Sequence, residues 1–234
     1  EYFRSAINKL KNFENQVAST IIDGSNILRE LNRIARRQFP WQFRTDPSLF
    51  IRYYKIFSNS RVAKIIEEKI GLNIQQWYTI GTVLLGAVLS NPKFSNDLKI
   101  ELDGLTKKDF DNFISLTATN LEGMVENIER DVKYNDQFAY SFNPLEYYPL
   151  VQISSFYYCP VPTFLAWRIT SGIYFDLIKG DSSGEFGRHF GLSFQDYLED
   201  VSRKIINANG IRIIPEKKYK IGIIIYRYLN IFGS

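Results

Sequence analysis

"NIQQWYTIGTVLLGAVL", Asn73 to Leu89, is the stretch that decides the fold. It opens with asparagine, a favourable N-cap, and Pro92 follows soon after its end and prevents the helix from continuing. After Trp77 the stretch is apolar on nearly every side, which predicts a helix at the centre of the core. We expect Gly81 and Gly86 to let neighbouring helices approach it closely.

The segments before and after this stretch are also predicted to be helical. Apolar residues recur every three or four positions over residues 2–21 and 27–35, which predicts two amphipathic helices. Asp46 is predicted to cap a helix whose first residue is Pro47, and Gly71 is predicted to end a helix over 62–70. Thr106 and Asp109 resemble a capping box at the start of another helix, and Asn120 is predicted to start the next one. Up to about residue 135 we therefore expect helices alone.

Proline marks a change of character over residues 140–162, which hold four of the eight prolines. Proline cannot donate a backbone hydrogen bond and disfavours the helical region for the residue before it, so this segment is predicted to be extended. The strand candidates within it are "LVQI" (150–153) and "SFYYC" (155–159). Thr163 is then predicted to cap a helix over "FLAWRITSGIYFDLI" (164–178).

The C-terminal part combines one long helix with two strands. "GEFGRHFGLSFQDYLEDVSRK" (184–204) has an apolar stripe and a charged opposite side, as an amphipathic helix requires. "IRII" (211–214) and "IGIIIYRYL" (221–229) are rich in Ile and Tyr, which favour strands. The predicted fold class is mainly α: a helical domain over residues 1–139, a proline-rich connector over 140–162, and a small α+β portion with an incomplete sheet over 163–234.

Composition narrows the class of protein. Hydrophobic residues make up 45% of the chain, which is typical of a globular rather than a disordered protein. The single cysteine, Cys159, cannot form an internal disulfide, which favours a reducing compartment and a cytoplasmic location. The longest apolar run, Tyr78 to Leu89, is shorter than the roughly 20 residues that a membrane span needs, so no membrane partner is expected.

Positive charge is concentrated near the N-terminus. The net charge is +4, but the first 70 residues alone carry 13 basic and 7 acidic side chains. The densest cluster contains five arginines: Arg29, Arg33, Arg36, Arg37 and Arg44. Such a cluster permits binding of nucleic acid, although scattered basic side chains are also common on ordinary solvated surfaces. Both interpretations stay open.

The only histidine, His189, lies at the edge of an apolar helical stripe and has no partner at a catalytic spacing. Its helix carries two pairs at i,i+4 spacing, which explain its charges structurally: Glu199 with Arg203, and Asp200 with Lys204. No family signature surrounds Cys159, so a buried thiol is favoured over a nucleophile. One histidine and one cysteine cannot supply the usual zinc ligands, and no metal site is predicted.

Three blocks of sequence carry a resemblance to a known group: "FNPLEYYPLVQI", "YYCPVPTFLAWRITSGIYFDL" and "FGRHFGLSFQDYLEDV". Their order resembles that in a group of uncharacterised bacterial proteins, some of them associated with phage defence. In that group a helical N-terminal region, a connector of the form NPL...PL...CP and a helix of the form FG..FG..FEDYV precede a nuclease module of the PD-(D/E)XK type. The resemblance covers about Asn143 to Val201.

The resemblance implies a nuclease core that this chain does not complete. The acidic residue of the first core helix falls on Gln195, and an amide can neither act as a metal-binding carboxylate nor as a base. The family holds Mg²⁺ with an Asp on one strand and an E-x-K on the next. Glu216 to Lys218 spell E-x-K, but they follow Pro215 in a predicted turn. Mg²⁺ is therefore expected only if a nuclease core is completed.

The function expected from these observations is that of a nuclease-related bacterial protein that is not catalytic in this chain. Its helical region is expected to bind nucleic acid or a partner protein. One alternative is a helical protein-interaction module with no nucleic-acid role. A second alternative is a metal-dependent nuclease that uses Glu216 and Lys218.

Overall fold

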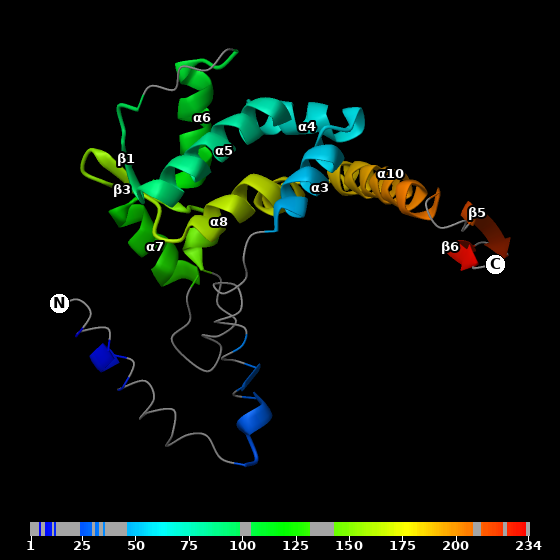
Figure 1. The fold of residues 1–234 in the computed structure, drawn as a ribbon, viewed down its shortest axis with the longest axis horizontal. Coiled ribbons are helices and arrows are strands. Elements are labelled where there is room, and N and C mark those ends of the chain that lie inside the picture. The colour runs from blue at the N-terminus through cyan, green and yellow to red at the C-terminus, as the bar shows by residue number, and fades with distance from the viewer. Residues whose placement is uncertain are drawn as a thin grey trace.

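The computed structural model describes most of the chain from residue 46 onward (Figure 1). The described ranges are 46–98, 104–131 and 143–207, the strand backbones of 212–221 and 224–232, and some positions among residues 5–35, including 24–29. Of the helix predicted over 27–35, residues 27–29, 31, 32 and 35 are described and are helical, whereas most of the helix predicted over 2–21 lies outside the described residues. Helices dominate the described residues and accompany a small open sheet, which confirms the mainly α class.

The first two fully described helices begin and end through local capping. α3 (Pro47–Phe57) has Asp46 as its N-cap, as predicted, and the Asp46 carboxylate accepts a hydrogen bond from a backbone N–H of the first turn. α4 (Ser60–Ile70) begins two residues earlier than predicted because Asn59 caps it. Gly71 ends α4 in the left-handed conformation, with φ of 68°, which glycine adopts without steric cost.

α5 (Ile74–Ser90) is central to the hydrophobic core, as predicted. Asn73 and Gln76 form a capping box at its start. Side chains spaced three or four residues apart are buried along one face: Trp77, Ile80, Leu84 and Val88. Neither α5 nor any other helix in the described ranges is long and apolar enough to cross a membrane.

Gly81 of α5 allows a neighbouring helix to pack closely, as expected, whereas Gly86 does not. A Cβ on Gly81 would lie 2.6 Å from Cγ1 of Ile169, closer than Cβ atoms approach other heavy atoms in proteins. A Cβ on Gly86 would meet no heavy atom within 4 Å, because this glycine faces solvent. The expectation is therefore confirmed for Gly81 and wrong for Gly86.

Gly81→Ala is expected to lower the free energy of unfolding by about 1 to 3 kcal/mol, because the new methyl group displaces Ile169 in a packed core. Gly86→Ala, on the same helix, is the matched control. It should raise the free energy of unfolding by about 0.5 to 1 kcal/mol, because alanine favours a helix more than glycine does. Urea denaturation followed by circular dichroism measures both, and changes of the same sign would contradict the packing at Gly81.

A four-stranded sheet combines short strands from distant parts of the chain. Its order is β1 (Lys93–Ser95), β4 (Phe156–Tyr158), β3 (Leu150–Ile153) and β2 (Ala118–Asn120), and only β2 with β3 is a parallel pair. β3 and β4 confirm the two strand candidates of the connector. The expectation of helices alone before residue 135 is wrong, because β1 and β2 are too short to show an alternating pattern.

α6 (Lys107–Thr117) and α7 (Leu121–Asp131) lie on either side of β2 in the sequence. Thr106 and Asp109 form the predicted capping box of α6 through reciprocal hydrogen bonds. The side chain of Asn120 accepts a hydrogen bond from the first turn of α7, at 2.7 Å. Both predicted helix starts are confirmed.

A π-helical turn divides the helix that follows the connector. α8 (Pro162–Trp167), the π segment η3 (Arg168–Gly172) and α9 (Ile173–Lys179) follow one another without a break. Proline takes the first helical position, where its missing N–H has no intrahelical partner to lose. The prediction that Thr163 caps this helix is therefore wrong, since the N-cap is Val161, which makes no side-chain cap hydrogen bond.

The C-terminal elements are one long helix and a hairpin. α10 (Glu185–Asn207) confirms the amphipathic helix. β5 (Arg212–Ile221) and β6 (Ile224–Phe232) pair antiparallel as a separate two-stranded sheet, so both strand predictions are confirmed and β5 is longer than predicted. In Figure 1, α10 and this hairpin extend away from the four-stranded sheet.

Elements on both sides of the connector share one hydrophobic cluster. It includes Trp77 and Phe113 from the part before residue 140, and Leu150, Ile169 and Phe186 from the part after it. The connector therefore contributes buried residues to the common core. The division into 1–139, 140–162 and 163–234 stays a prediction.

Candidate functional site

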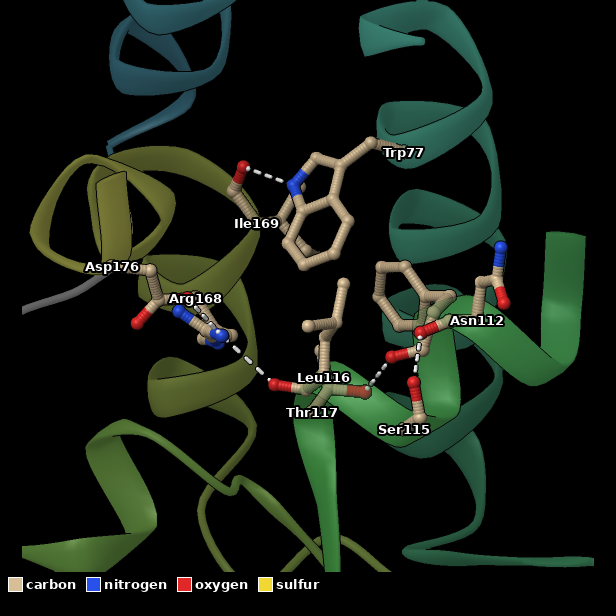
Figure 2. A network of polar contacts seen from close by, with 9 residues as sticks. Trp77, Asn112, Ser115, Leu116, Thr117, Arg168, Ile169 and Asp176 are labelled. Atoms are coloured by element: carbon tan, nitrogen blue, oxygen red, sulfur yellow. Dashed lines mark hydrogen bonds and ion pairs between the residues drawn. The ribbon is translucent and has the colours of Figure 1, made fainter. Parts of the chain in front are cut away.

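A buried arginine is the most unusual polar feature of the core. Arg168 opens the π segment η3, and its side chain is only 3% exposed. Its Nη2 donates to the carbonyl oxygen of Leu116 at 2.8 Å and to Oδ2 of Asp176 at 2.5 Å (Figure 2). Its Nε and Nη1 are buried and have no hydrogen-bond partner in the described part of the chain. The guanidinium thus has donor capacity that these residues do not use.

Two aromatic rings accompany the guanidinium. Its Cζ lies 5.9 Å from the ring centroid of Trp77 and 5.9 Å from that of Tyr147, which follows the short 3-10 helix η2 (Pro144–Glu146). Attraction between a cation and the face of an aromatic ring stabilises a charge that burial has removed from water. Trp77 is held in turn by a hydrogen bond from its Nε1 to the carbonyl oxygen of Ile169, at 2.9 Å (Figure 2).

The π segment contains both Arg168 and the carbonyl group of Ile169 that Trp77 contacts. A π turn interrupts the regular hydrogen-bond ladder, so a carbonyl such as that of Ile169 can accept a bond from another element. Gly172 leaves room for the arginine, because a Cβ at this position would lie 3.2 Å from Cδ of Arg168. Since π turns are frequent at functional sites, this segment marks a candidate site.

Arg168 lines a surface cleft of about 300 Å³, and a second cleft of about 400 Å³ adjoins it. The two share four lining residues: Tyr147, Tyr148, Asp176 and Gly180. The charged lining residues are four cations and one carboxylate: Lys69, Arg130, Arg168, Lys179 and Asp176. We call the joint opening the Arg168 cleft. Its positive charge beside two tyrosine rings suits an anionic ligand with a planar group.

The basic cluster predicted from the sequence falls almost wholly outside the described residues. Of its five arginines only Arg29 is described, and it is exposed. Arg33, Arg36, Arg37 and Arg44 lie outside the described ranges. Binding of nucleic acid by this cluster stays a prediction.

The E-x-K sequence lies in a strand and not in the predicted turn. The backbone of Glu216 and Lys218 belongs to β5, whose pairing with β6 shifts between Ile214 and Lys217. An irregularity at this point accommodates Pro215, which cannot donate to the strand ladder. The predicted turn is wrong, whereas the catalytic role of Glu216 and Lys218 stays a prediction. Nicking of plasmid DNA with Mg²⁺ would support that role only if Lys218→Ala abolished it.

Gln195 and Glu216 do not by themselves supply the ligands of a Mg²⁺ site of the nuclease type. Gln195 is a neutral amide on the exposed side of α10, and Glu216 is the only acidic residue after Gly210. Mg²⁺ prefers several oxygen ligands that include carboxylates. Within the described residues, no group of three or more His, Cys, Asp or Glu side chains could hold a metal ion.

Packing accounts for His189 and Cys159. Nε2 of His189 lies 3.8 Å from the carboxylate of Glu185, one turn away on α10. Its Nδ1 is buried without a hydrogen-bond partner among the described residues. Burial raises the pKa of the Cys159 thiol to about 12, so the thiol stays protonated near neutral pH. The prediction of a buried cysteine is confirmed.

The acidic side chains of α10 hold this helix against α3 and α4. Both predicted pairs within the helix are present: Glu199 with Arg203, and Asp200 with Lys204. Asp200 also pairs with Lys55 of α3 at 3.1 Å, and Asp196 pairs with Arg61 of α4 at 2.5 Å. Hydrogen bonds from Lys204 and Lys55 hold the pKa of Asp200 below its usual value. These contacts give the carboxylates of α10 a structural role.

Sequence reasoning missed the Arg168 cleft. The signal that could have identified it is a single arginine inside the otherwise apolar start of the helix, "FLAWRI", because an arginine is rarely buried without partners. Its partners Leu116 and Tyr147 come from other elements, so the sequence alone could not assemble them.

Comparison with protein-family models, with curated proteins and with solved structures finds no match to this chain. The resemblance of residues 143–201 to nuclease-associated proteins therefore stays an expectation.

Proposed function

We propose that this chain is a nuclease-related bacterial protein that binds nucleic acid and is not itself catalytic. The observation that carries the proposal is the Arg168 cleft, whose lining includes four cationic side chains and two tyrosines. Cationic side chains attract phosphates, and aromatic rings stack on unpaired bases, a combination typical of proteins that bind single strands. The arginines between Arg29 and Arg44 support the same proposal. A cytoplasmic location and a role in defence against foreign DNA belong to it.

Fluorescence anisotropy with labelled single-stranded and duplex oligonucleotides tests this proposal. We expect binding at low ionic strength that weakens about tenfold between about 50 and 200 mM salt if two phosphates are contacted. One variant reverses the charges of Arg33, Arg36 and Arg37, and another carries Lys69→Glu with Lys179→Glu. Comparing the two variants shows whether the N-terminal arginines or the Arg168 cleft bind the oligonucleotide. Absence of binding at low ionic strength would overturn the proposal.

Exposed apolar side chains favour a second candidate, a helical protein-interaction module with no nucleic-acid role. Phe194, Leu198 and Ile205 are all exposed on α10. Exposed apolar surface often marks a protein contact. This candidate predicts no nucleic-acid binding at any salt concentration and an association that Leu198→Glu weakens in sedimentation experiments. Leu89→Glu, at an exposed apolar position on α5, is the matched control.

A further inference from the structure

The guanidinium of Arg168 is held in one orientation while part of it remains unused. Nη2 is tied to Leu116 and Asp176, so the group cannot turn freely. The N–H groups on Nε and Nη1 have no acceptor within the described residues. Buried polar groups in native proteins almost always have a hydrogen-bond partner, which comes from protein, water or a ligand. A ligand with several acceptor oxygens suits this position best.

The charge of the Arg168 cleft indicates which oxygen-rich group it accepts. Both parts of the Arg168 cleft contain a lysine. Lys69 of α4 lines the part that contains Arg168, and Lys179 of α9 lines the other part. The carboxylate of Asp176 pairs with Arg168, and the two lysines add further positive charge to the lining. A phosphate monoester carries about −1.5 to −2 charge at neutral pH, compared with −1 for a carboxylate, and offers three strong acceptor oxygens. It therefore matches the remaining charge better than a carboxylate does.

The aromatic lining and the size of the cleft indicate what the phosphate is attached to. Tyr147 and Tyr148 line both parts of the cleft, and their ring centroids lie 6.5 Å apart. Tyrosine rings accept a nucleobase by stacking. Volumes of about 300 and 400 Å³ are within the usual range for small-molecule sites. They suit one nucleotide and not a duplex.

We propose that the Arg168 cleft binds a phosphate monoester carried by a nucleoside, either the phosphorylated end of a strand or a free nucleotide. The inference rests on the proposed function for the class of ligand and names the group that the cleft recognises. Asp176 keeps the guanidinium paired when no ligand is bound. When the ligand binds, Arg168 and Lys69 contact its phosphate, and Tyr147 and Tyr148 contact its base.

Titration calorimetry of the full chain with adenosine monophosphate, adenosine and inorganic phosphate tests this inference. Charge-assisted hydrogen bonds to phosphate should make the monophosphate bind at least about tenfold more tightly than adenosine. Lys69→Gln should weaken binding of the monophosphate about tenfold. Lys64→Gln, at an exposed position of the same helix that does not line the cleft, should change it by less than about twofold.

Oligonucleotides with a terminal phosphate or a terminal hydroxyl distinguish the two sources of the ligand. A preference for the phosphorylated oligonucleotide with weak binding of the monophosphate identifies the end of a strand, and the reverse identifies a free nucleotide. Either result supports the inference. Binding of the monophosphate without binding of any oligonucleotide would sustain the cleft assignment and overturn the proposed function.

The inference is overturned if adenosine monophosphate binds no better than adenosine and the terminal phosphate changes nothing. Salt-dependent binding of the same oligonucleotides would in that case leave the proposed function in place. Arg168→Lys supplies a second readout, because lysine keeps the charge but lacks the fork of donors. This variant, checked for folding by circular dichroism, should lose the preference for phosphate and still bind the hydroxyl-ended oligonucleotide.

Discussion

Asp176→Ala is expected to lower the free energy of unfolding by about 3 to 5 kcal/mol, because it leaves the charge of Arg168 buried without its ionic partner. The Arg168 side chain is 3% exposed, so its charge is largely removed from water and depends on the carboxylate of Asp176. Asp176→Asn should cost less than Asp176→Ala, because the amide keeps an oxygen acceptor for Nη2. Urea denaturation followed by circular dichroism measures both changes.

Asp196→Ala is the matched control for this prediction. Asp196 also forms a short ion pair with an arginine, Arg61, but the side chain of Asp196 is 51% exposed. Pairs in contact with water contribute only about 0.2 to 1 kcal/mol, so the loss at Asp196 should be small. Equal losses at Asp176 and Asp196 would show that Arg168 is not paired in a water-poor environment.

Trp77→Ala is expected to lower the free energy of unfolding by about 3 to 5 kcal/mol, the usual cost of removing a large side chain from a packed core. Trp77 is fully buried, and its ring centroid lies 4.7 Å from that of Phe113. The change also leaves the carbonyl of Ile169 without the indole N–H and removes a ring beside Arg168. Thermal and urea denaturation followed by circular dichroism measure the loss.

Two further variants separate the causes of that loss. Trp77→Phe retains an aromatic ring but not the hydrogen bond to Ile169, so it should cost about 1 to 3 kcal/mol. Leu89→Ala, near the solvent-exposed end of the same helix, should change stability by less than about 0.5 kcal/mol. A loss at Trp77 no larger than that at Leu89 would be incompatible with a central position of α5 in the core.

Much of the fold could be predicted because its signals are local. Asp46, Asn73, Thr106 and Asn120 each accept a hydrogen bond from a residue two or three positions later, so the helix starts can be recognised without tertiary contacts. Gly71 ends a helix by its own backbone freedom. The candidate site could not be predicted in the same way, because Leu116 lies 52 positions before Arg168.

The sequence by itself therefore determined where α3, α5, α6 and α7 begin, that α5 is central, and that the fold is mainly α. Only the tertiary structure decided that Gly81 and not Gly86 lies against a neighbour, that β1 and β2 join the strands of the connector, and that Arg168 faces a positively charged cleft. The physical reason is the separation along the sequence between the residues that interact. Capping and periodicity act within about one helical turn, whereas the bond between Trp77 and Ile169 joins residues 92 positions apart and exists only once the helices have packed.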